Sequence, residues 1–380
     1  MEQKKIAILT QPLKSNYGGI IQNYALQKVL KNNDFNVITV DRDYPEFSKI
    51  KLTLSFYKRK ILSFLKNNNN VVLSKKNLKE ILSNSTNFIE TNINRTSKIR
   101  NEKALTDVFD TNNFDAVIVG SDQVWRPMYS PNIYNYYLDF LIDNKNIKKI
   151  AYAASFGTDQ WEYDKDQTQY CKELVEEFDL VTVREKSALK LVENNFNVKA
   201  HFVLDPTLLL SKEDYNNLIY YEKSLINNKG IYTYVLDRNT DKNNLISNIE
   251  EILDTKSFFC QPKFSINQPI SKTIEDYKYP KVQQWLKGFN DADFIITDSF
   301  HGTVFSIIYN KPFIAIANKE RGASRFESLL EELGLLDRLV YSNAEVTEEL
   351  IKRKIDFDTV NSKIKILKEQ SLQLLLSSIC

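Results

Sequence analysis

The feature that most constrains the fold is the stretch 293–312, which predicts a buried strand, a tight turn and a helix in immediate succession. Its run Phe294-Ile295-Ile296 is short and wholly apolar, as is typical of strands that are covered on both faces in a parallel sheet. Asp298 and Ser299 follow, and both are residue types that cap helix N-termini. Apolar residues then recur at helical spacing, so His301 is expected in the first helical turn, beside free backbone N–H groups.

This position makes His301 a candidate functional residue. Ligands of open α/β sheets bind outside the carboxyl ends of the strands, and a helix N-terminus at that edge attracts anions. The chain has two histidines, and the other, His201, precedes a predicted strand and is interpreted as structural. Taken alone, the local features favour a satisfied core or surface histidine, and only the other polar residues at the strand ends favour a functional one.

Polar residues follow several other predicted strands in the same way. They are Asn16 to Gly19, Ser121 to Gln123, Ser155, Arg184, Ser299 to His301, and Arg321 with Arg325. The alternation of strand, polar turn and helix predicts an α/β protein with two Rossmann-like domains that face each other across a cleft. The paired Gly18 and Gly19 would let backbone approach a ligand closely. Neither a dinucleotide fingerprint nor a phosphate-binding G-K-[ST] loop is present.

The length of 380 residues favours two domains over one core. Asp205-Pro206 resembles a junction, because proline biases the residue before it toward extended backbone. We therefore expect an N-terminal domain over 1–205, a C-terminal domain over 206–345, and C-terminal helices over 346–380 that pack back on the first domain.

Composition excludes several classes of protein. A net charge of +2 gives no reason to expect nucleic-acid binding, and no apolar run approaches the roughly 20 residues that span a bilayer. The three cysteines are far apart and odd in number, so neither a disulfide framework nor a zinc site is expected. The charged N-terminus predicts no signal peptide, and we expect a cytoplasmic protein.

Residues 49–66 differ from the rest, because six basic residues alternate with apolar ones and no acid intervenes. Such a segment can lie on an anionic membrane surface, at the inner face of the cell membrane. The alternative is a helix that packs on its own domain and exposes its charges.

The types of residue at the strand ends indicate an anionic substrate. Arg184, Arg321 and Arg325 can bind phosphate or carboxylate through two parallel hydrogen bonds. A histidine beside them could transfer protons. No group of metal-ligating residue types accompanies them, so no metal is predicted.

These segments together resemble the polysaccharide pyruvyl transferase family. The matching segments are Asn16 to Ala25, Val119 to Trp125, Val183 to Glu185, Leu204 to Pro206, Thr297 to Thr303 and Arg321 to Arg325. The resemblance implies a fold similar to the glycosyltransferase B architecture and transfer of pyruvate from phosphoenolpyruvate to a sugar as a cyclic ketal, with release of phosphate and no further cofactor. Acceptors in the family are cell-surface glycans or their lipid-linked precursors, so the acceptor could be carried on polyprenyl diphosphate.

The resemblance also implies roles for individual residues. His301 would be the general acid, and Asp122 or Asp298 would orient the acceptor or take a proton. The expected binding residues are Asn16, Tyr17, Gly18, Gly19, Asn23, Ser121, Gln123, Arg184, Ser299, Gly302, Arg321 and Arg325. Many members carry Arg-Leu-His where this chain has Ser299-Phe300-His301, so we expect Arg321 and Arg325 to replace the missing charge.

Two other functions remain compatible with the sequence. A nucleotide-sugar glycosyltransferase on the same fold would place a diphosphate at the same helix N-terminus, with Glu320 as the nearby acid. A non-catalytic glycan- or anion-binding protein with a degenerate site would also explain the missing arginine.

Overall fold

The computed structural model describes residues 3–45, 73–222, 225–266, 271, 273–317 and 322–380. The basic segment 49–66, Glu320 and Arg321 therefore lie outside the described residues, and what we expected of them stays a prediction.

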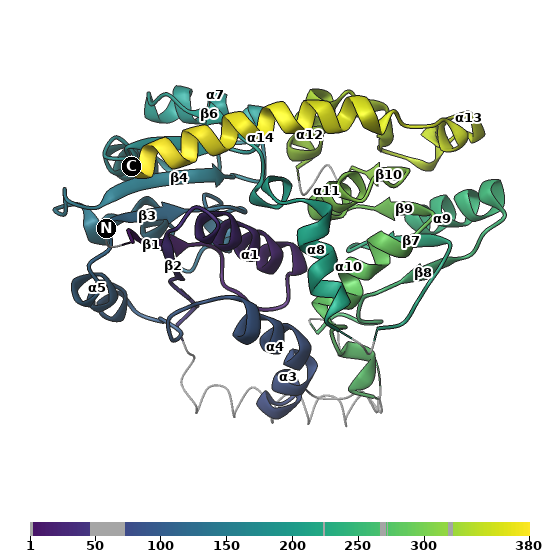
Figure 1. The fold of residues 1–380 in the computed structure, drawn as a ribbon, viewed down its shortest axis with the longest axis horizontal. Helices are drawn as coiled ribbons and strands as arrows, with labels where there is room; N and C mark the ends of the chain where they lie inside the picture. The colour runs from purple at the N-terminus through teal and green to yellow at the C-terminus, as the bar shows by residue number, and fades with distance from the viewer. Residues whose placement is uncertain (1–2, 46–72, 223–224, 267–270, 272, 318–321) are drawn as a thin grey trace.

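Two parallel sheets organise the described part of the chain (Figure 1). The first has the order β2-β1-β3-β4-β5-β6 and the second the order β11-β10-β9-β7-β8. The strands of the first sheet are β1 (Lys5–Leu9), β2 (Asn36–Thr39), β3 (Ala116–Val119), β4 (Lys148–Ala154), β5 (Leu180–Val183) and β6 (His201–Phe202); those of the second are β7 (Ile231–Tyr234), β8 (Ser257–Phe259), β9 (Phe294–Thr297), β10 (Phe313–Ile316) and β11 (Leu339–Val340). Every paired strand is parallel to its neighbour, which confirms the predicted α/β class with two Rossmann-like domains.

Helices cover both faces of each sheet. Their bounds are α1 (Tyr17–Lys31), α3 (Lys75–Ile81), α4 (Ser83–Asn92), α5 (Glu102–Thr111), α6 (Lys165–Val175), α7 (Lys186–Phe196), α8 (Lys212–Tyr220), α9 (Thr240–Leu253), α10 (Val282–Asp291), α11 (Phe300–Ile308), α12 (Ser324–Leu333), α13 (Glu348–Lys352) and α14 (Phe357–Ile379). The strands are continuous apolar runs because successive side chains point to opposite faces of the sheet, and each face is covered by its own core. In β1, Ile6 and Ile8 join the core that contains α1, while Ala7 and Leu9 join the core of α5, α6 and α7.

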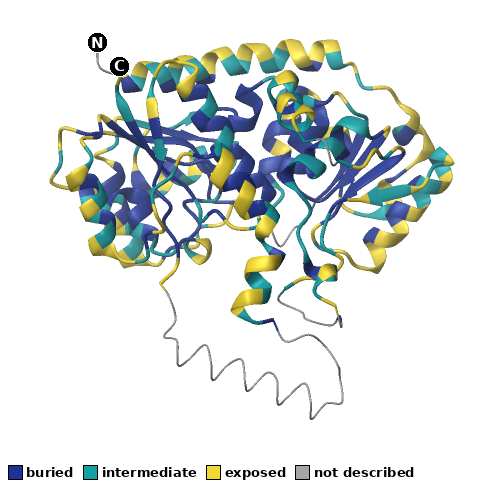
Figure 2. Cartoon of the chain, turned by 60° about the horizontal axis from the view of Figure 1, so that its bottom comes forward, coloured by how far each residue is buried: buried dark blue, intermediate teal, exposed yellow. Residues whose placement is uncertain are grey.

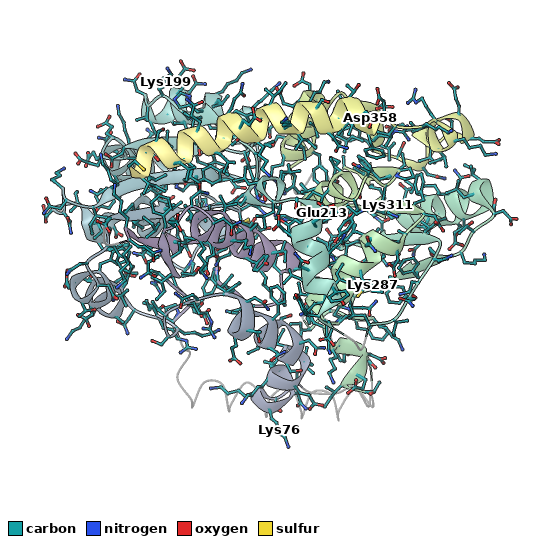
Figure 3. The ribbon with its side chains drawn as sticks, in the orientation of Figure 1. Lys76, Lys199, Glu213, Lys287, Lys311 and Asp358 are labelled. Carbon is teal, nitrogen blue, oxygen red and sulfur yellow. The ribbon has the colours of Figure 1, made fainter. Side chains whose placement is uncertain are left out.

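One apolar core continues from one domain into the other. It contains Ile20 and Leu26 of α1 together with Trp285 of α10 and Phe305 of α11. Tyr17 adds a polar tie, because its hydroxyl donates to the carbonyl of Pro280 at 2.6 Å. Buried residues fill this middle region in Figure 2, whereas labelled charged residues such as Lys76 and Lys199 lie on the outer surface (Figure 3).

Each sheet has one point at which the strand order reverses. In the first sheet the chain goes from β1 to β2 on one side and returns to β3 on the other. In the second, β7 leads to β8 on one side and β9 lies on the other. Such a point opens a crevice at the carboxyl ends of the two strands, which is where open α/β sheets bind ligands. The loops after β1, β3, β7 and β9 are therefore the places to look for a site.

Helix α14 runs along the top of both domains in Figure 1 and brings the C-terminus close to the N-terminus. Its buried Ser371 accepts a hydrogen bond from the backbone N–H of Leu204 at 3.0 Å. At its end, the side chain of Lys4 donates to the carbonyl of Ile379 at 2.8 Å. Within the described residues, no helix is long and apolar enough to cross a membrane.

Candidate active site

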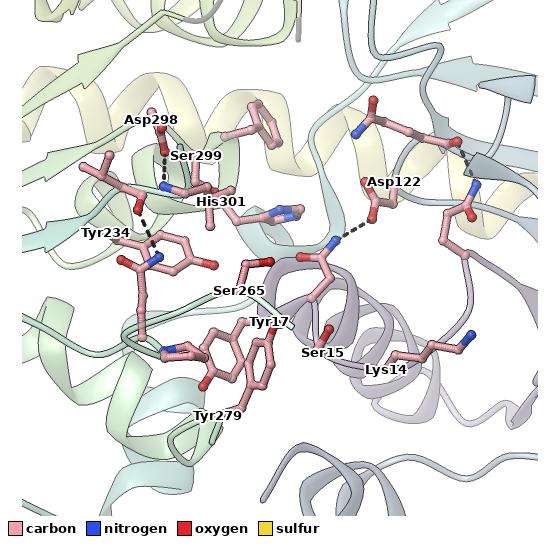
Figure 4. Close-up of a pocket in the computed structure, with 18 of the residues that line it drawn as sticks. Lys14, Ser15, Tyr17, Asp122, Tyr234, Ser265, Tyr279, Asp298, Ser299 and His301 are labelled. Carbon is pink, nitrogen blue, oxygen red and sulfur yellow. Dashed lines mark hydrogen bonds between the residues drawn. The ribbon is translucent and has the colours of Figure 1, made fainter. Parts of the chain in front are cut away.

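A cavity of about 810 Å³ lies between the two domains, at the two points where the strand orders reverse. Figure 4 shows Asp298, Ser299, His301 and Tyr234 on one side and Asp122 and Lys14 on the other, with Tyr17 beside Tyr279 below His301. The predicted site residues that line it are Asn16, Tyr17, Asp122, Gln123, Asp298, Ser299, His301 and Arg325. Segments far apart in the sequence thus share one cleft, as the two-domain prediction requires.

His301 lies in the first turn of α11, where the sequence predicted it. The helix begins because Ser299 caps it, its hydroxyl accepting from the backbone N–H of Gly302 at 3.4 Å. The imidazole crosses to the other domain and packs on Gly18 of α1. A Cβ at Gly18 would lie 2.1 Å from the Nδ1 of His301, so only glycine leaves room for the ring. Two helix N-termini, one from each domain, therefore meet at this histidine.

Asp205 is the acidic partner of His301. Its Oδ2 lies 3.6 Å from Nε2 of the histidine, and Nε2 is buried with no hydrogen-bond partner among the described residues. The other oxygen, Oδ1, accepts from the N–H and the hydroxyl of Thr207 at 3.0 and 2.7 Å. Burial acts to raise the pKa of Asp205, but the charges of His301 and Arg184 outweigh it and hold that pKa below the ordinary value. The carboxylate is thus ionised and fixed, and it can orient the imidazole.

Sequence reasoning treated Asp205 as a domain junction and missed this contact. The Leu204-Asp205-Pro206 segment was part of the family resemblance, and that was the signal that could have found it.

Arg184 is fully buried and binds other protein groups. Its guanidinium donates to Asp205 at 2.7 Å and to Asp122 at 3.0 Å, and it lies 4.9 Å from the centre of the Phe300 ring. It does not line the cavity. We had expected Arg184 to bind substrate, but in this structure it links the two carboxylates because both need a buried counter-charge.

Several other predicted binding residues also lie away from the cavity. Asn23 is in the core, where its side-chain oxygen accepts from Thr39 at 2.9 Å. Ser121 is buried and donates to Ala153 or Asp205, each at 3.1 Å. The predicted glycines serve close packing instead. They are Gly18 against His301, Gly19 against Asn16 and Asp122, and Gly302, where a Cβ would lie 2.1 Å from the hydroxyl oxygen of Thr297.

The two predicted carboxylates, Asp122 and Asp298, have different surroundings. Burial acts to raise the pKa of Asp122, but the charges of Arg184, His301 and Arg325 lower it below the ordinary value. Asp298 accepts from the backbone N–H groups of Leu236 and Asp237 at 2.6 and 3.1 Å and from Lys242 at 2.6 Å. It therefore fixes the loop between β7 and α9 at the edge of the cavity.

Arg325, one of the predicted binding residues, lines the same cavity as His301. It lies in the first turn of α12, and its guanidinium is 5.9 Å from the centre of the Phe300 ring. Burial, and next the charge of Arg184, lower the pKa of Arg325 to about 10, so it remains a cation at neutral pH. Phe300 thus lies against two guanidinium groups, which favour the face of an aromatic ring.

In the described part of the chain, four more cations line the cavity, and the sequence analysis did not identify them as site residues. Three are paired with carboxylates: Lys14 with Asp43 at 2.7 Å, Arg126 with Glu162 at 2.8 Å, and Lys263 with Asp276 at 3.0 Å. The fourth, Arg238, has no such ion pair with any described residue; it donates to the hydroxyl of Thr233 at 2.9 Å and lies over the ring of Phe259.

Burial lowers the pKa of Arg238 because it disfavours the charged guanidinium. A bound anion would stabilise that charge. The signal for it in the sequence was its place just after β7, at a strand's carboxyl end. Among the described residues, no group of three or more His, Cys, Asp or Glu side chains could hold a metal ion.

Solved structures of similar shape define the class of fold. The UDP-N-acetylglucosamine 2-epimerase of Rickettsia bellii matches with a TM-score of 0.52 and 10% identity, over 100% of this chain and 97% of that chain. UGT89C1 of Arabidopsis thaliana, complexed with UDP-L-rhamnose, matches with a TM-score of 0.55 and 9% identity, over 100% of both chains. At such identities the likeness shows the fold alone, and that fold is the two-domain glycosyltransferase B architecture.

The family follows from the sequence. The model of the family described as polysaccharide pyruvyl transferase matches residues 16–320, and the chain belongs to that family. Membership makes it a transferase with a sugar acceptor and confirms the predicted resemblance. No functionally curated protein matches the chain.

Proposed function

We propose that this transferase moves pyruvate from phosphoenolpyruvate to two hydroxyls of one sugar, forming a cyclic ketal and releasing phosphate. The observation that carries the proposal is the setting of His301. A buried histidine, beside the Asp205 carboxylate, lies in a cavity that Arg238, Arg325 and the N-terminus of α11 also line. Positive groups around a proton donor suit a small molecule that carries both a phosphate and a carboxylate.

The donor would bind on the C-terminal side of the cavity. Arg238 and Arg325 supply positive charge there, and the N-terminus of α11 adds backbone N–H groups. Arg325, which we expected with Arg321 to replace the family's missing arginine, would fill that role, and Arg238 is a further candidate for it. Arg184 would act indirectly, by holding Asp122 and Asp205 ionised.

The reaction delivers one proton to the methylene carbon and removes two from the sugar hydroxyls, and the departing phosphate carries away the remaining proton. With Asp205 facing Nε2, the Nδ1 of His301 is the ring nitrogen left to exchange a proton. Protonation of the methylene carbon turns it into a methyl group and makes C2 electrophilic. The first sugar hydroxyl adds to C2 and gives up its proton, and the C2–O bond to phosphate breaks. The second hydroxyl then closes the ring and loses its proton, a step made effectively unimolecular by the bound diol.

The same histidine can serve both halves of this sequence. After it has given its proton, the neutral imidazole can accept one from a sugar hydroxyl. Asp122 is a weaker choice of base because its pKa is lowered, which makes its carboxylate reluctant to take a proton. We therefore give Asp122 the role of orienting groups through Arg184 and Asn16, which approach its two oxygens at 3.0 and 3.5 Å.

Phosphate release tests the proposal directly. The protein is incubated with phosphoenolpyruvate and a panel of sugar glycosides, and inorganic phosphate is measured. We expect release that requires both substrates, together with a product that is heavier than the acceptor by one pyruvate less water. A thermal-shift panel provides the contrast, because a ligand raises the melting temperature of the folded state that binds it. Stabilisation by uridine diphosphate, with none by phosphoenolpyruvate, would contradict the proposal in favour of glycosyl transfer.

A further inference from the structure

Two tyrosines stand out on the wall that the N-terminal domain contributes to the cavity. Tyr44 lies in the segment after β2, and Tyr129 lies in the segment between β3 and β4. Both rings line the cavity, and their exposed fractions are 41% and 39%. The hydroxyl of Tyr44 donates to the carbonyl of Tyr129 at 2.7 Å, which holds the two segments together. Rings that are this exposed inside a cavity leave apolar surface in water, and a ligand can cover it.

Each ring also has a cation packed against it. Nζ of Lys14 lies 5.1 Å from the centre of the Tyr44 ring, and the guanidinium of Arg126 lies 5.0 Å from that of Tyr129. The cations are themselves fixed by carboxylates, Lys14 by Asp43 and Arg126 by two hydrogen bonds to Glu162. Each ring is thus held by a cation that is itself fixed, so ligand binding would order few additional side chains.

The charge of this wall decides which substrate it suits. Among the described residues, the two cations that line this wall each pair with a carboxylate, Lys14 with Asp43 and Arg126 with Glu162. Asp43 also pairs with Lys98 and Arg100, which do not line the cavity. Arg238, on the opposite domain, forms no ion pair with any described residue, although the charge of Asp298 acts on it. An anionic donor is therefore drawn to the side of Arg238, and the tyrosine wall is left for a neutral molecule with an apolar face. A pyranose ring fits, because one face carries C–H groups while its edge carries hydroxyls.

We infer that Tyr44 and Tyr129 form the platform on which the acceptor sugar stacks, and that they help to select it. The inference deepens the proposed function, and it rests on that function for treating the stacked sugar as the acceptor. The stacking itself needs no phosphoenolpyruvate and can be tested without it.

The first test is sugar binding in the absence of the donor. Saturation-transfer NMR is recorded with methyl β-D-galactoside, methyl β-D-glucoside and methyl N-acetyl-β-D-mannosaminide. We expect the wild-type protein to bind at least one of them, with the strongest transfer to the ring C–H protons. Tyr44→Ala and Tyr129→Ala should weaken that binding about tenfold or more, whereas the Phe variants, which keep the rings, should stay within about threefold. Tyr220→Ala is the matched control, because Tyr220 is 80% exposed and lies outside the cavity.

The second test separates this inference from the proposed function. With whichever glycoside the wild type binds, Tyr44→Ala and Tyr129→Ala should raise the acceptor KM and leave the KM for phosphoenolpyruvate unchanged. Binding by none of the glycosides, or binding unaltered in both Ala variants, overturns the platform even if phosphate is released. Sugar binding that the Ala variants lose, in a protein that releases no phosphate from phosphoenolpyruvate, supports the platform and contradicts the proposed function.

Discussion

Single residues connect the two domains at the histidine. His301 comes from α11, its orienting carboxylate Asp205 comes from the segment after β6, and the glycine that makes room for its ring comes from α1. Arg184 then links Asp205 to Asp122 at the end of β3. The imidazole is therefore positioned by residues that are distant in sequence. Substitution of any of them should alter the position of the His301 ring.

Replacement of His301 by alanine removes the proposed proton donor. We expect turnover to fall by about 10²- to 10⁴-fold, the usual effect of losing a general acid–base group, while the protein stays folded. Phosphate release and a melting curve measure the two effects. Near-normal turnover in His301→Ala would remove this residue from the mechanism.

Gly18→Ala tests whether the glycine is needed to seat the ring. The new Cβ would meet Nδ1 of His301 at 2.1 Å and Cγ at 2.6 Å, so the imidazole has to move. We expect turnover to fall and stability to decrease by about 1–3 kcal/mol, as for other overpacked sites. Gly19→Ala is the control in the same helix, because its nearest contacts are at 3.2 Å and its effects should be smaller. Equal effects of the two changes would refute this explanation.

Arg238→Gln tests the idea that the donor binds to a cation that has no ion pair with any described residue. Loss of a charged hydrogen bond to phosphate or carboxylate is worth about 1.5–3 kcal/mol, so the KM for phosphoenolpyruvate should rise about tenfold or more. Lys263→Gln is the matched control, since Lys263 also lines the cavity but is already paired with Asp276. If both variants raise that KM equally, charge balance does not decide where the donor binds.

At the scale of elements, α14 links the two domains. It packs against α12 of the C-terminal domain and against β4 of the N-terminal domain, and its Leu375 and Ile379 enter the core that the domains share. Ser371 also satisfies the backbone N–H of Leu204, next to Asp205. The helix therefore supports the segment that carries the histidine's partner.

Leu375→Ala measures that support. The side chain is fully buried, so its removal should lower the free energy of unfolding by about 2–5 kcal/mol. Ile366→Ala is the control on the same helix, because Ile366 is exposed and the change should stay within about 0.5 kcal/mol. Urea denaturation of both variants measures the difference. If they are equally stable, α14 contributes little to the core.

At the scale of the whole molecule, a cluster of buried charges lies where the two domains meet. Burial acts to raise the pKa values of Asp122 and Asp205, but the cations beside them lower both below the ordinary value. A carboxyl group with a lowered pKa in the folded state adds stability that is complete above its ordinary pKa of about 4. That stability is lost as the pH falls through the lower, folded-state value. The cluster at the domain interface should therefore make folding sensitive to acid.

Acid unfolding of the whole protein checks this. Each of the two groups should add up to about 1.4 kcal/mol per pH unit to the decline of stability below about pH 4. Asp205→Asn should remove its share of that slope, while Asp107→Asn, at an exposed position, should leave the slope as in the wild type. Measurement of urea unfolding between pH 3 and 6 gives the slopes. An unchanged slope in Asp205→Asn would mean that this carboxylate does not govern acid stability.

The sequence by itself determined the α/β class, the strand–turn–helix around His301 and the family, because these depend on local patterns. Apolar runs of four residues mark strands buried on both faces, and Ser299 caps a helix wherever it folds. Only the tertiary structure decided which polar residues reach the cavity. Arg184 and Asn23 lie at the expected strand and helix but turn into the protein, whereas Arg238 and Asp205 become site residues. Pairing of buried charges depends on which distant segments the fold brings together, and no local pattern encodes that.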